Sequence, residues 1–135
     1  MQLLEARLNG RLGVSFWESK QLQLALPYFK SQLALLKQLG DMPGTARVCC
    51  RIGNVLHDLR EYSQAIDMYV EHLELATQMD DKLEIVRAHG HIGRIYQVQE
   101  RHHKALEIYR KRLAIARQIN NPEVWVPHPG VEGNA

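Results

Sequence analysis

The fold is decided by the stretch Arg51-Ile52-Gly53-Asn54-Val55-Leu56, because its pattern recurs 40 residues earlier and 40 residues later. Leu-Gly-x-x-Phe at 12–16 and Ile-Gly-x-x-Tyr at 92–96 are the two further copies. The register holds downstream in three equivalent sets: Ala25, Ala65 and Ala105; Phe29, Tyr69 and Tyr109; and Leu33, Leu73 and Leu113. Self-similarity with a period of about 20 to 50 residues is typical of a solenoid, in which each repeat buries its apolar face on its neighbours.

Each repeat has the apolar spacing of two helices joined by a short turn, so the chain is predicted to be an all-α solenoid of three antiparallel helix pairs. The predicted helices span about residues 3–17, 22–39, 45–59, 63–79, 83–98 and 102–119. Pro27 falls inside the second helix, where we expect a bend and not a break. Gly40 predicts a helix end, and Pro43 suits the start of the next helix.

The three repeats are predicted to occupy about residues 6–45, 46–85 and 86–121, within one domain covering residues 1–121. Beyond Asn120-Asn121-Pro122 the period is lost. Residues 122–135 hold three of the nine glycines and two of the five prolines, so this segment is predicted to be a flexible tail.

Composition gives no indication of several broad classes of protein. The 135 residues carry 17 Lys and Arg against 15 Asp and Glu, and a net charge of +2 is too balanced to indicate nucleic acid or a membrane surface by itself. No segment approaches the roughly 18 apolar residues of a membrane span, and the start lacks a signal peptide's apolar region. Cys49 and Cys50 are neighbours that point about 100° apart on a helix, so we expect reduced thiols and a cytoplasmic protein.

The first helix of the second repeat separates cleanly into an apolar and a polar face. Its apolar side chains are Val48, Ile52, Val55, Leu56 and Leu59. Gly53 costs roughly 1 kcal/mol of helix propensity against Ala, and its recurrence as Gly13 and Gly93 therefore predicts close packing. We expect Ala25, Ala65 and Ala105 opposite these glycines, with the aromatic residue one turn further on wedged between successive repeats.

These residues resemble the tetratricopeptide repeat: a large apolar residue followed by Gly, an aromatic or Leu three positions later, Ala twelve after the Gly, and an aromatic four after that. The period of 40 is similar to the long-repeat subclass of the Leu-Gly-Asn repeat adaptors and the kinesin light chain. The resemblance implies a right-handed superhelix. It also implies that the first helices of the pairs line a concave groove, which binds an extended or helical peptide of a partner protein.

The polar side of the first helices would then be the binding face. It carries two basic rows at equivalent repeat positions: Arg7, Arg47 and Arg87, and then Arg11, Arg51 and His91. With Arg94 added, only Glu18 and Asp58 oppose these charges, so a locally basic groove is expected on a nearly neutral protein. Guanidinium forks suit carboxylates, which predicts an acidic peptide ligand. The predicted partner-binding residues are Arg7, Arg11, Trp17, Arg47, Cys50, Arg51, Asn54, His57, Arg87, His91, Arg94 and Gln97.

Asn54 and Gln97 are expected to form hydrogen bonds with a peptide backbone. Trp17 and Cys50 each have two possible roles. Trp17 either contacts ligand near one end of the groove or packs under an N-terminal cap. Cys50 is either a small groove residue or a thiol activated by neighbouring arginines. His89, His91, His102 and His103 point to different helix faces and lack a completing Cys or carboxylate, so no metal or cofactor is expected.

No catalytic motif is present, so the protein is not expected to be an enzyme. RNA binding is a rival function for a helical repeat, but Trp17 is the one candidate for base stacking in the groove. Self-association is a third possibility, because the last helix keeps apolar side chains with no following repeat to cover them. Either a homodimer through this end or docking of the tail through Val124–Val126 would cover them.

Overall fold

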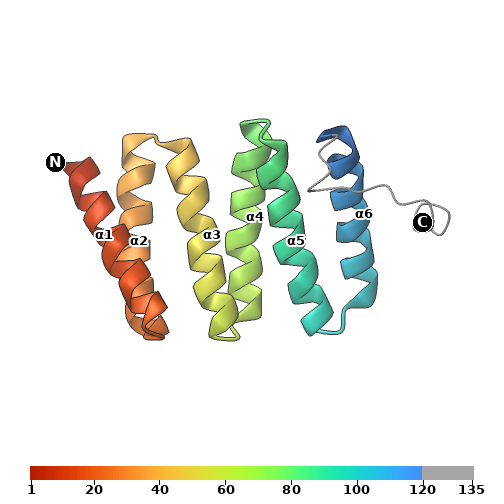
Figure 1. Ribbon diagram of the computed structural model, residues 1–135, viewed down its shortest axis with the longest axis horizontal. Coiled ribbons are helices and arrows are strands. Elements are labelled where there is room, and N and C mark those ends of the chain that lie inside the picture. The colour runs from red at the N-terminus through yellow and green to blue at the C-terminus, as the bar shows by residue number, and fades with distance from the viewer. Residues whose placement is uncertain (120–135) are drawn as a thin grey trace. The chain divides into compact units, whose positions relative to one another are not determined.

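The structure is a computed structural model that describes residues 1–119, and all six predicted helices are present (Figure 1). No strand occurs within residues 1–119. The helices are α1 (Gln2–Glu18), α2 (Leu22–Leu39), α3 (Met42–Asp58), α4 (Tyr62–Gln78), α5 (Lys82–Val98) and α6 (His102–Ile119). The predicted tail, including Trp125 and Val124–Val126, lies outside the described residues.

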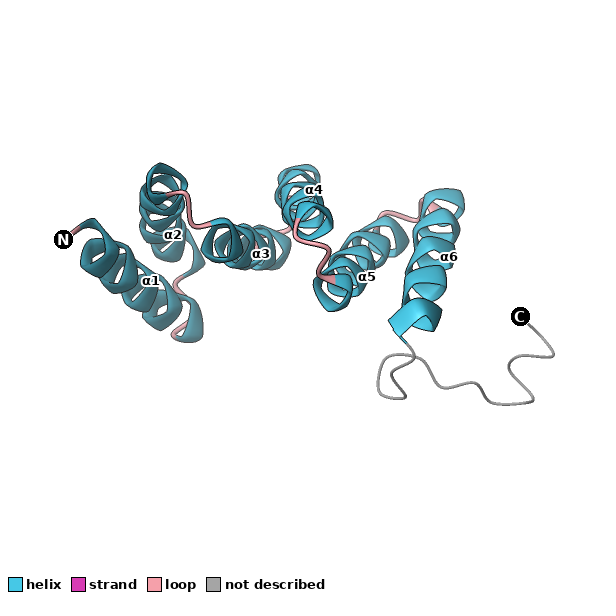
Figure 2. Ribbon diagram, turned by 90° about the horizontal axis from the view of Figure 1, so that it is seen from above, coloured by secondary structure: helices cyan, strands magenta, loops and turns pink. Residues whose placement is uncertain are grey.

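The helices pack as adjacent pairs, α1 with α2, α3 with α4, and α5 with α6. Residues 1–79 form one compact unit, in which α2 also packs against α3, as Figure 2 shows. A second compact unit begins at Asp80 and contains α5 and α6. The first two helix pairs therefore share one core, and the third pair is described by itself. The repeat boundaries near residues 45 and 85 stay a prediction.

The helix ends follow the local chemistry of the sequence. α3 begins three residues before its predicted start because Asp41 caps it: the Asp41 Oδ1 accepts a hydrogen bond of 2.9 Å from the Gly44 N–H, and Pro43 lies in the first turn. Asp81 caps α5 in the same way, through a bond of 3.3 Å from the Glu84 N–H. α2 continues through Pro27, which confirms that this proline does not break the helix.

The turn inside each helix pair has the same closed geometry. Lys20, Arg60 and Glu100 have φ angles of 66°, 64° and 59°, in the left-handed region. In the first pair, the Lys20 N–H donates to the Trp17 carbonyl at 2.9 Å and the Gln21 N–H to the Phe16 carbonyl at 2.8 Å. These two bonds make a Schellman motif, which satisfies carbonyls that the ending helix would leave unpaired. The other two pairs repeat both bonds.

The spacing of 16 residues between glycine and aromatic residue recurs in each repeat for a direct packing reason. A Cβ at Gly13 would lie 2.7 Å from the Phe29 ring, and a Cβ at Gly53 would lie 2.6 Å from the Tyr69 ring. A Cβ at Gly93 would likewise lie 2.6 Å from Tyr109. The ring of the same repeat is thus the nearest neighbour of each glycine, and Ala25, Ala65 and Ala105 are also buried. The predicted contact between these alanines and the glycines stays a prediction.

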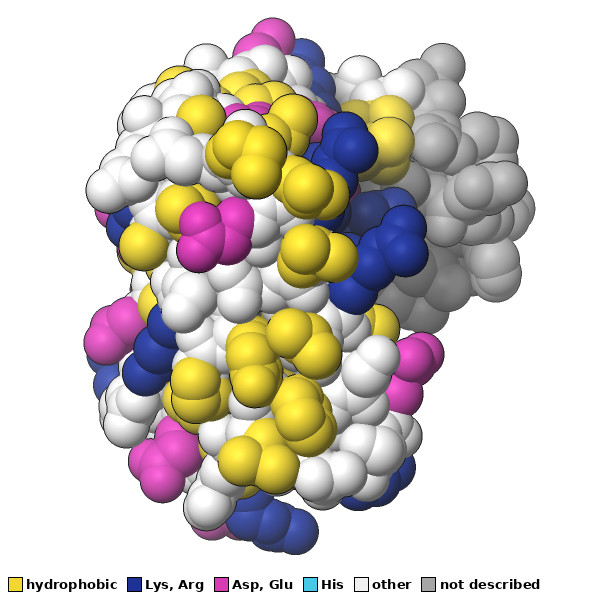
Figure 3. Space-filling view, turned by 90° about the vertical axis from the view of Figure 1, so that its left-hand side faces the viewer, with side chains coloured by type: hydrophobic (Ala, Val, Ile, Leu, Met, Phe, Trp, Pro, Cys, Tyr) yellow, Lys and Arg dark blue, Asp and Glu magenta, His cyan; other side chains and the backbone are white. Residues whose placement is uncertain are grey.

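The outer face of α1 leaves large apolar side chains exposed, and Figure 3 shows hydrophobic side chains gathered on this end of the first compact unit. Leu8 and Leu12 are 52% and 45% exposed, whereas Val48 and Ile52, their equivalents on α3, are 1% exposed. The difference follows from packing, because α3 contacts both α2 and α4 while α1 packs mainly on α2.

Candidate functional site

A pocket of about 610 Å³ opens where α1, α2 and α3 meet in the first compact unit. Its lining residues are Arg7, Gly10, Arg11, Val14, Ser15, Gln32 and Arg51. Three of these seven residues are arginines and none is acidic. The structure thus brings together Arg7, Arg11 and Arg51, three of the predicted partner-binding residues, around one cavity.

Gln32 of α2 forms part of the pocket wall and was missed by the sequence reasoning. Its side chain is buried, with 9% of the residue exposed, and its Oε1 has no hydrogen-bond partner within residues 1–119. A Cβ at Gly10 would lie 2.9 Å from the Gln32 Cδ, so the glycine gives this amide its space. An unsatisfied buried polar group costs roughly 1–3 kcal/mol, which makes Oε1 a ready acceptor for a ligand donor.

The charges of the pocket lack compensation by protein carboxylates. Within residues 1–119, no ion pair links Arg7, Arg11, Arg47 or Arg51 to an acidic side chain. Arg51 is half-buried, and its pKa is lowered by burial first and by the charge of Arg47 second. The pocket therefore holds positive charge that an anion would stabilise.

Two further predicted binding residues of the first compact unit, Trp17 and His57, make specific contacts near the C-terminal ends of α1 and α3. The Trp17 Nε1 donates a hydrogen bond of 3.0 Å to the Asp58 Oδ2, so Trp17 links α1 to α3. The His57 ring lies 5.6 Å from the Tyr62 ring, and its Nδ1 is 4.0 Å from the Asp58 Oδ1. Asp58, one of the two acids expected to oppose the arginines, is therefore engaged by Trp17 and His57.

Asn54 is oriented by the second helix of its own repeat. The Tyr69 hydroxyl donates to the Asn54 Oδ1 at 2.6 Å, which leaves the amide N–H groups of Asn54 to donate elsewhere. Gln97 of α5 repeats the arrangement, because its Oε1 accepts a bond of 2.7 Å from the Tyr109 hydroxyl. Both amides are thus positioned as donors, as a peptide backbone would require.

The second compact unit holds the other predicted groove residues on α5. Arg87 is paired with Glu84, at 2.9 Å between Nη1 and Oε2, so the expectation that only Glu18 and Asp58 oppose the basic rows was wrong. The signal was available in the sequence, since an acidic residue three positions before an arginine on a helix lies on the same face. His91 is half-buried and Arg94 is exposed.

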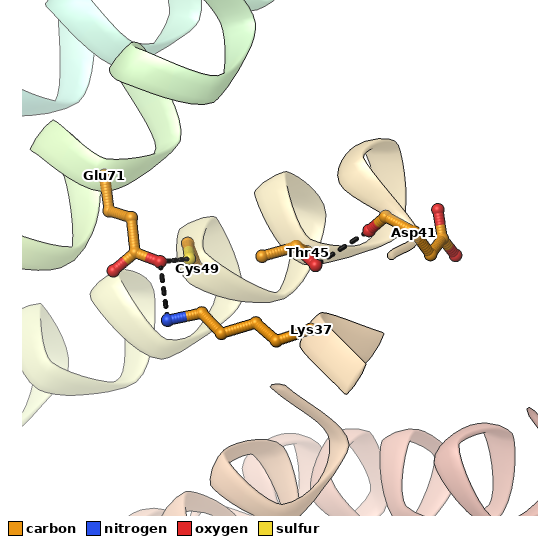
Figure 4. Close-up of polar contacts among 5 residues, drawn as sticks. All are labelled: Lys37, Asp41, Thr45, Cys49 and Glu71. Atoms are coloured by element: carbon orange, nitrogen blue, oxygen red, sulfur yellow. Dashed lines mark hydrogen bonds and ion pairs between the residues drawn. The ribbon is translucent and has the colours of Figure 1, made fainter. Parts of the chain in front are cut away.

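The two cysteines are free thiols with different surroundings. Cys49 is buried, and burial together with Glu71 raises its pKa to about 12. Its Sγ donates to the Glu71 Oε2 at 3.4 Å, and the same oxygen pairs with the Lys37 Nζ at 3.0 Å (Figure 4). This cluster ties α2, α3 and α4 together and keeps the Cys49 thiol protonated at neutral pH. Cys50 is half-buried on α3 and precedes Arg51 in the sequence.

Metal-ligand clusters and membrane-spanning helices are both absent from residues 1–119. No group of three His, Cys, Asp or Glu side chains within residues 1–119 could hold a metal ion. In the same part of the chain, every helix is too short or too polar to span a membrane. His89 is buried, and its pKa is lowered by burial first and then by Lys111 and Arg112.

A family model for the tetratricopeptide repeat matches residues 4–78 and 50–118. The chain belongs to the tetratricopeptide repeat family. Its helix pairs are tetratricopeptide repeats, and its fold class is the all-α solenoid of that family. This fold is in general a non-catalytic interaction scaffold, so the repeats indicate a protein-interaction module. A sequence search of the curated proteins finds no match to this chain.

Solved structures share the tetratricopeptide fold at low sequence identity. The TPR domain of Arabidopsis FLU is 22% identical with a TM-score of 0.79, over 90% of this chain and 100% of that domain. Aspartyl phosphate phosphatase F from Bacillus subtilis is 16% identical with a TM-score of 0.81, over 89% of this chain and 32% of its own. BtubC (BKLC) from P. vanneervenii is 17% identical with a TM-score of 0.78, over 92% and 50%. The chain thus spans about a third of the phosphatase and half of BtubC.

Proposed function

We propose that this tetratricopeptide-repeat chain binds an acidic peptide segment of a partner protein along the polar faces of its first helices. The observation that carries the proposal is the pocket lined by Arg7, Arg11 and Arg51 without an acidic side chain. Guanidinium groups donate paired N–H bonds to carboxylates, so such a surface favours segments rich in Glu or Asp.

The oriented amides support a peptide as the ligand. Asn54 and Gln97 each have their oxygen engaged by a tyrosine hydroxyl, and their N–H groups can donate to backbone carbonyls of a bound segment. Charge alone would hold any polyanion, whereas an oriented amide donor adds a contact that suits the backbone of an extended chain.

The test reverses two exposed arginines that lie outside the pocket lining. Arg47→Glu combined with Arg87→Glu should raise the Kd for an acidic peptide at least tenfold, which corresponds to about 1.4 kcal/mol. Binding is measured by fluorescence anisotropy with a labelled Glu- and Asp-rich peptide. Added salt should weaken binding to the wild type, because exposed charges are screened over about 8 Å at physiological ionic strength.

The matched control is Lys30→Glu with Arg110→Glu, on exposed positions of the second helices α2 and α6. It changes the net charge by the same amount and should leave peptide binding intact. Equal loss in both double variants, or tighter binding of single-stranded RNA than of the peptide at the same salt, would contradict the proposal. Helicity by circular dichroism checks that both variants fold.

Three finer assignments are part of the same proposal. Two free thiols fit a reducing compartment, so we place the protein in the cytoplasm.

Self-association is a second candidate role, favoured by exposed apolar side chains such as Leu106 on α6, which is 51% exposed. A homodimer through this last helix would appear in light scattering at two concentrations. Residues 1–121 are proposed as the repeat domain, followed by a tail.

A further inference from the structure

The pocket between α1, α2 and α3 has more positive charge than one carboxylate can balance. Arg7, Arg11 and Arg51 line it, and Arg47 is close enough to Arg51 to lower its pKa further after burial has lowered it. One guanidinium can satisfy both oxygens of a carboxylate through a bidentate pair. A single Glu or Asp side chain would therefore leave two arginines of the lining without an anionic partner.

A phosphate monoester matches this arrangement better. It carries a charge of about −1.5 to −2 at pH 7 and has three strong acceptor oxygens. Three guanidinium forks around one cavity can distribute their donors over three oxygens, and the hydroxyl of Ser15 can add a further donor. Recognition of phosphorylated side chains by arginine clusters is a general mode of peptide binding.

The buried side chain of Gln32 favours a phosphorylated peptide over free phosphate as the ligand. The buried Oε1 of Gln32 has no partner within residues 1–119, and it needs a donor. A phosphate dianion offers no hydrogen to donate, whereas the backbone N–H groups of a phosphorylated segment do. Arginines for the phosphoryl group and an amide oxygen for a backbone N–H together make a site with two chemically distinct parts.

We infer that the pocket lined by Arg7, Arg11, Arg51 and Gln32 binds a phosphorylated side chain, phosphoserine or phosphothreonine, within the acidic segment of the partner. This inference rests on the proposed function and assigns its anchor point. Phosphorylation of the partner would then increase its affinity for the groove, and the rest of the acidic segment would add charge along α3.

The experiment compares three forms of the same peptides. A library with a central phosphoserine, flanked by randomised Asp, Glu, Gly and Ala positions, is selected on the full chain, and the best peptides are resynthesised with Ser or Glu at the centre. Isothermal titration calorimetry with wild type should give at least tenfold tighter binding for the phosphoserine form than for the Glu form. The Ser form should be weaker still.

Two variants remove different parts of the site. Gln32→Glu is nearly isosteric and places a carboxylate in the pocket, so it should reduce the preference for phosphoserine over Glu to about one. Arg51→Gln should do the same through loss of a donor fork. Gln23→Glu, an exposed position on the same helix α2, makes the same charge change and should keep the wild-type preference. Arg51→Gln keeps the test decisive if Gln32→Glu folds poorly.

The possible results distinguish failure of the phosphoryl site from failure of the proposed function. Equal affinity of the phosphoserine and Glu forms for wild type overturns the phosphoryl site while acidic-peptide binding stands. A preference that persists in Arg51→Gln, or that is lost equally in Gln23→Glu, also overturns it. If none of the acidic peptides binds, with or without phosphate, the proposed function fails and the site fails with it.

Discussion

Gly90 and Gly93 lie one turn apart on α5 and should respond in opposite directions to the same substitution. In Gly93→Ala, the new Cβ would lie 2.6 Å from the Tyr109 ring, and overpacking of this kind costs about 1–3 kcal/mol. In Gly90→Ala, the Cβ would meet the flexible end of Arg112 at 3.1 Å, so the helix-propensity gain of up to about 1 kcal/mol should remain. Urea denaturation measures both changes.

Each variant is a control for the other, because both replace a glycine of α5 by alanine and both gain the same helix propensity. Gly93→Ala should lower the free energy of unfolding, and Gly90→Ala should raise it or leave it unchanged. If Gly93→Ala proves as stable as Gly90→Ala, the contact between glycine and ring does not explain the repeat.

At two kinds of position, the periodic glycines and Gln32, the sequence did not predict the side-chain contacts that the structure shows. The periodic glycines predicted close packing, but the ring was not identified as their neighbour because a helical wheel gives direction and not reach. Gln32 was missed because its equivalents are His72 and Arg112, so no pattern links the three positions. Its role emerges only when α1, α2 and α3 are placed together around the pocket.

At the scale of helices, α1 and α3 are equivalent by repeat but differ in what covers them. Ile52→Ala, at a position that is 1% exposed, should cost about 2–5 kcal/mol because it leaves a cavity between helices. Leu12→Ala is the equivalent change at a position that is 45% exposed, and it should cost less than about 1 kcal/mol. Thermal unfolding of both variants gives the comparison.

Similar losses at the two positions would show that the outer face of α1 is covered in solution. Repeating the measurement at two protein concentrations is the control, because cover by a second copy would make the loss at Leu12 depend on concentration.

Helix positions were the most predictable elements of this chain. The periodicity located all six helices, and five of them begin within one residue of the predicted start. The exception is α3, where the Asp41 cap and Pro43 extend the helix towards the N-terminus. Caps depend on a backbone geometry that apolar spacing does not report, so this boundary was the one most displaced.

For the whole molecule, the buried His89 predicts a stability that falls at acidic pH. Burial, then Lys111 and Arg112, lower its pKa below the usual 6.5, so the unfolded chain binds a proton more readily than the folded chain. Stability present above pH 6.5 is therefore lost as pH falls through the folded pKa, by at most about 1.4 kcal/mol per pH unit from this group. His89→Gln should flatten this part of the profile.

Urea denaturation at pH 7.5 and pH 5.5 measures the effect. The control is His102→Gln, an exposed position on α6, which should keep the wild-type difference between the two pH values. A His89→Gln variant with an unchanged pH dependence would exclude this histidine as its source.

The fold of the whole chain followed from the repeat, but the candidate site followed only in part. Repeat positions correctly placed the polar residues outside the cores and brought Arg7, Arg11 and Arg51 into one list. The pairing of Glu84 with Arg87 could have been inferred from their spacing on one helix, whereas the bond between Trp17 and Asp58 could not, because it depends on side-chain reach between helices. Charge pairing depends on which individual side chains can reach one another, whereas helix packing follows the 40-residue repeat.

Within each helix pair, the turn restricts the movement of the backbone between the two helices. Lys20, Arg60 and Glu100 have a left-handed backbone conformation, which is costly for residues other than glycine. Two backbone hydrogen bonds close each turn. Such a turn can open only if the neighbouring helix ends unwind. The turn of each pair therefore resists hinging, and if the chain binds the proposed acidic segment, adaptation within a pair would fall to its side chains. Under the proposed function, most of the ordering entropy would then fall on the incoming segment, so a partner segment that is already stiff would bind more tightly.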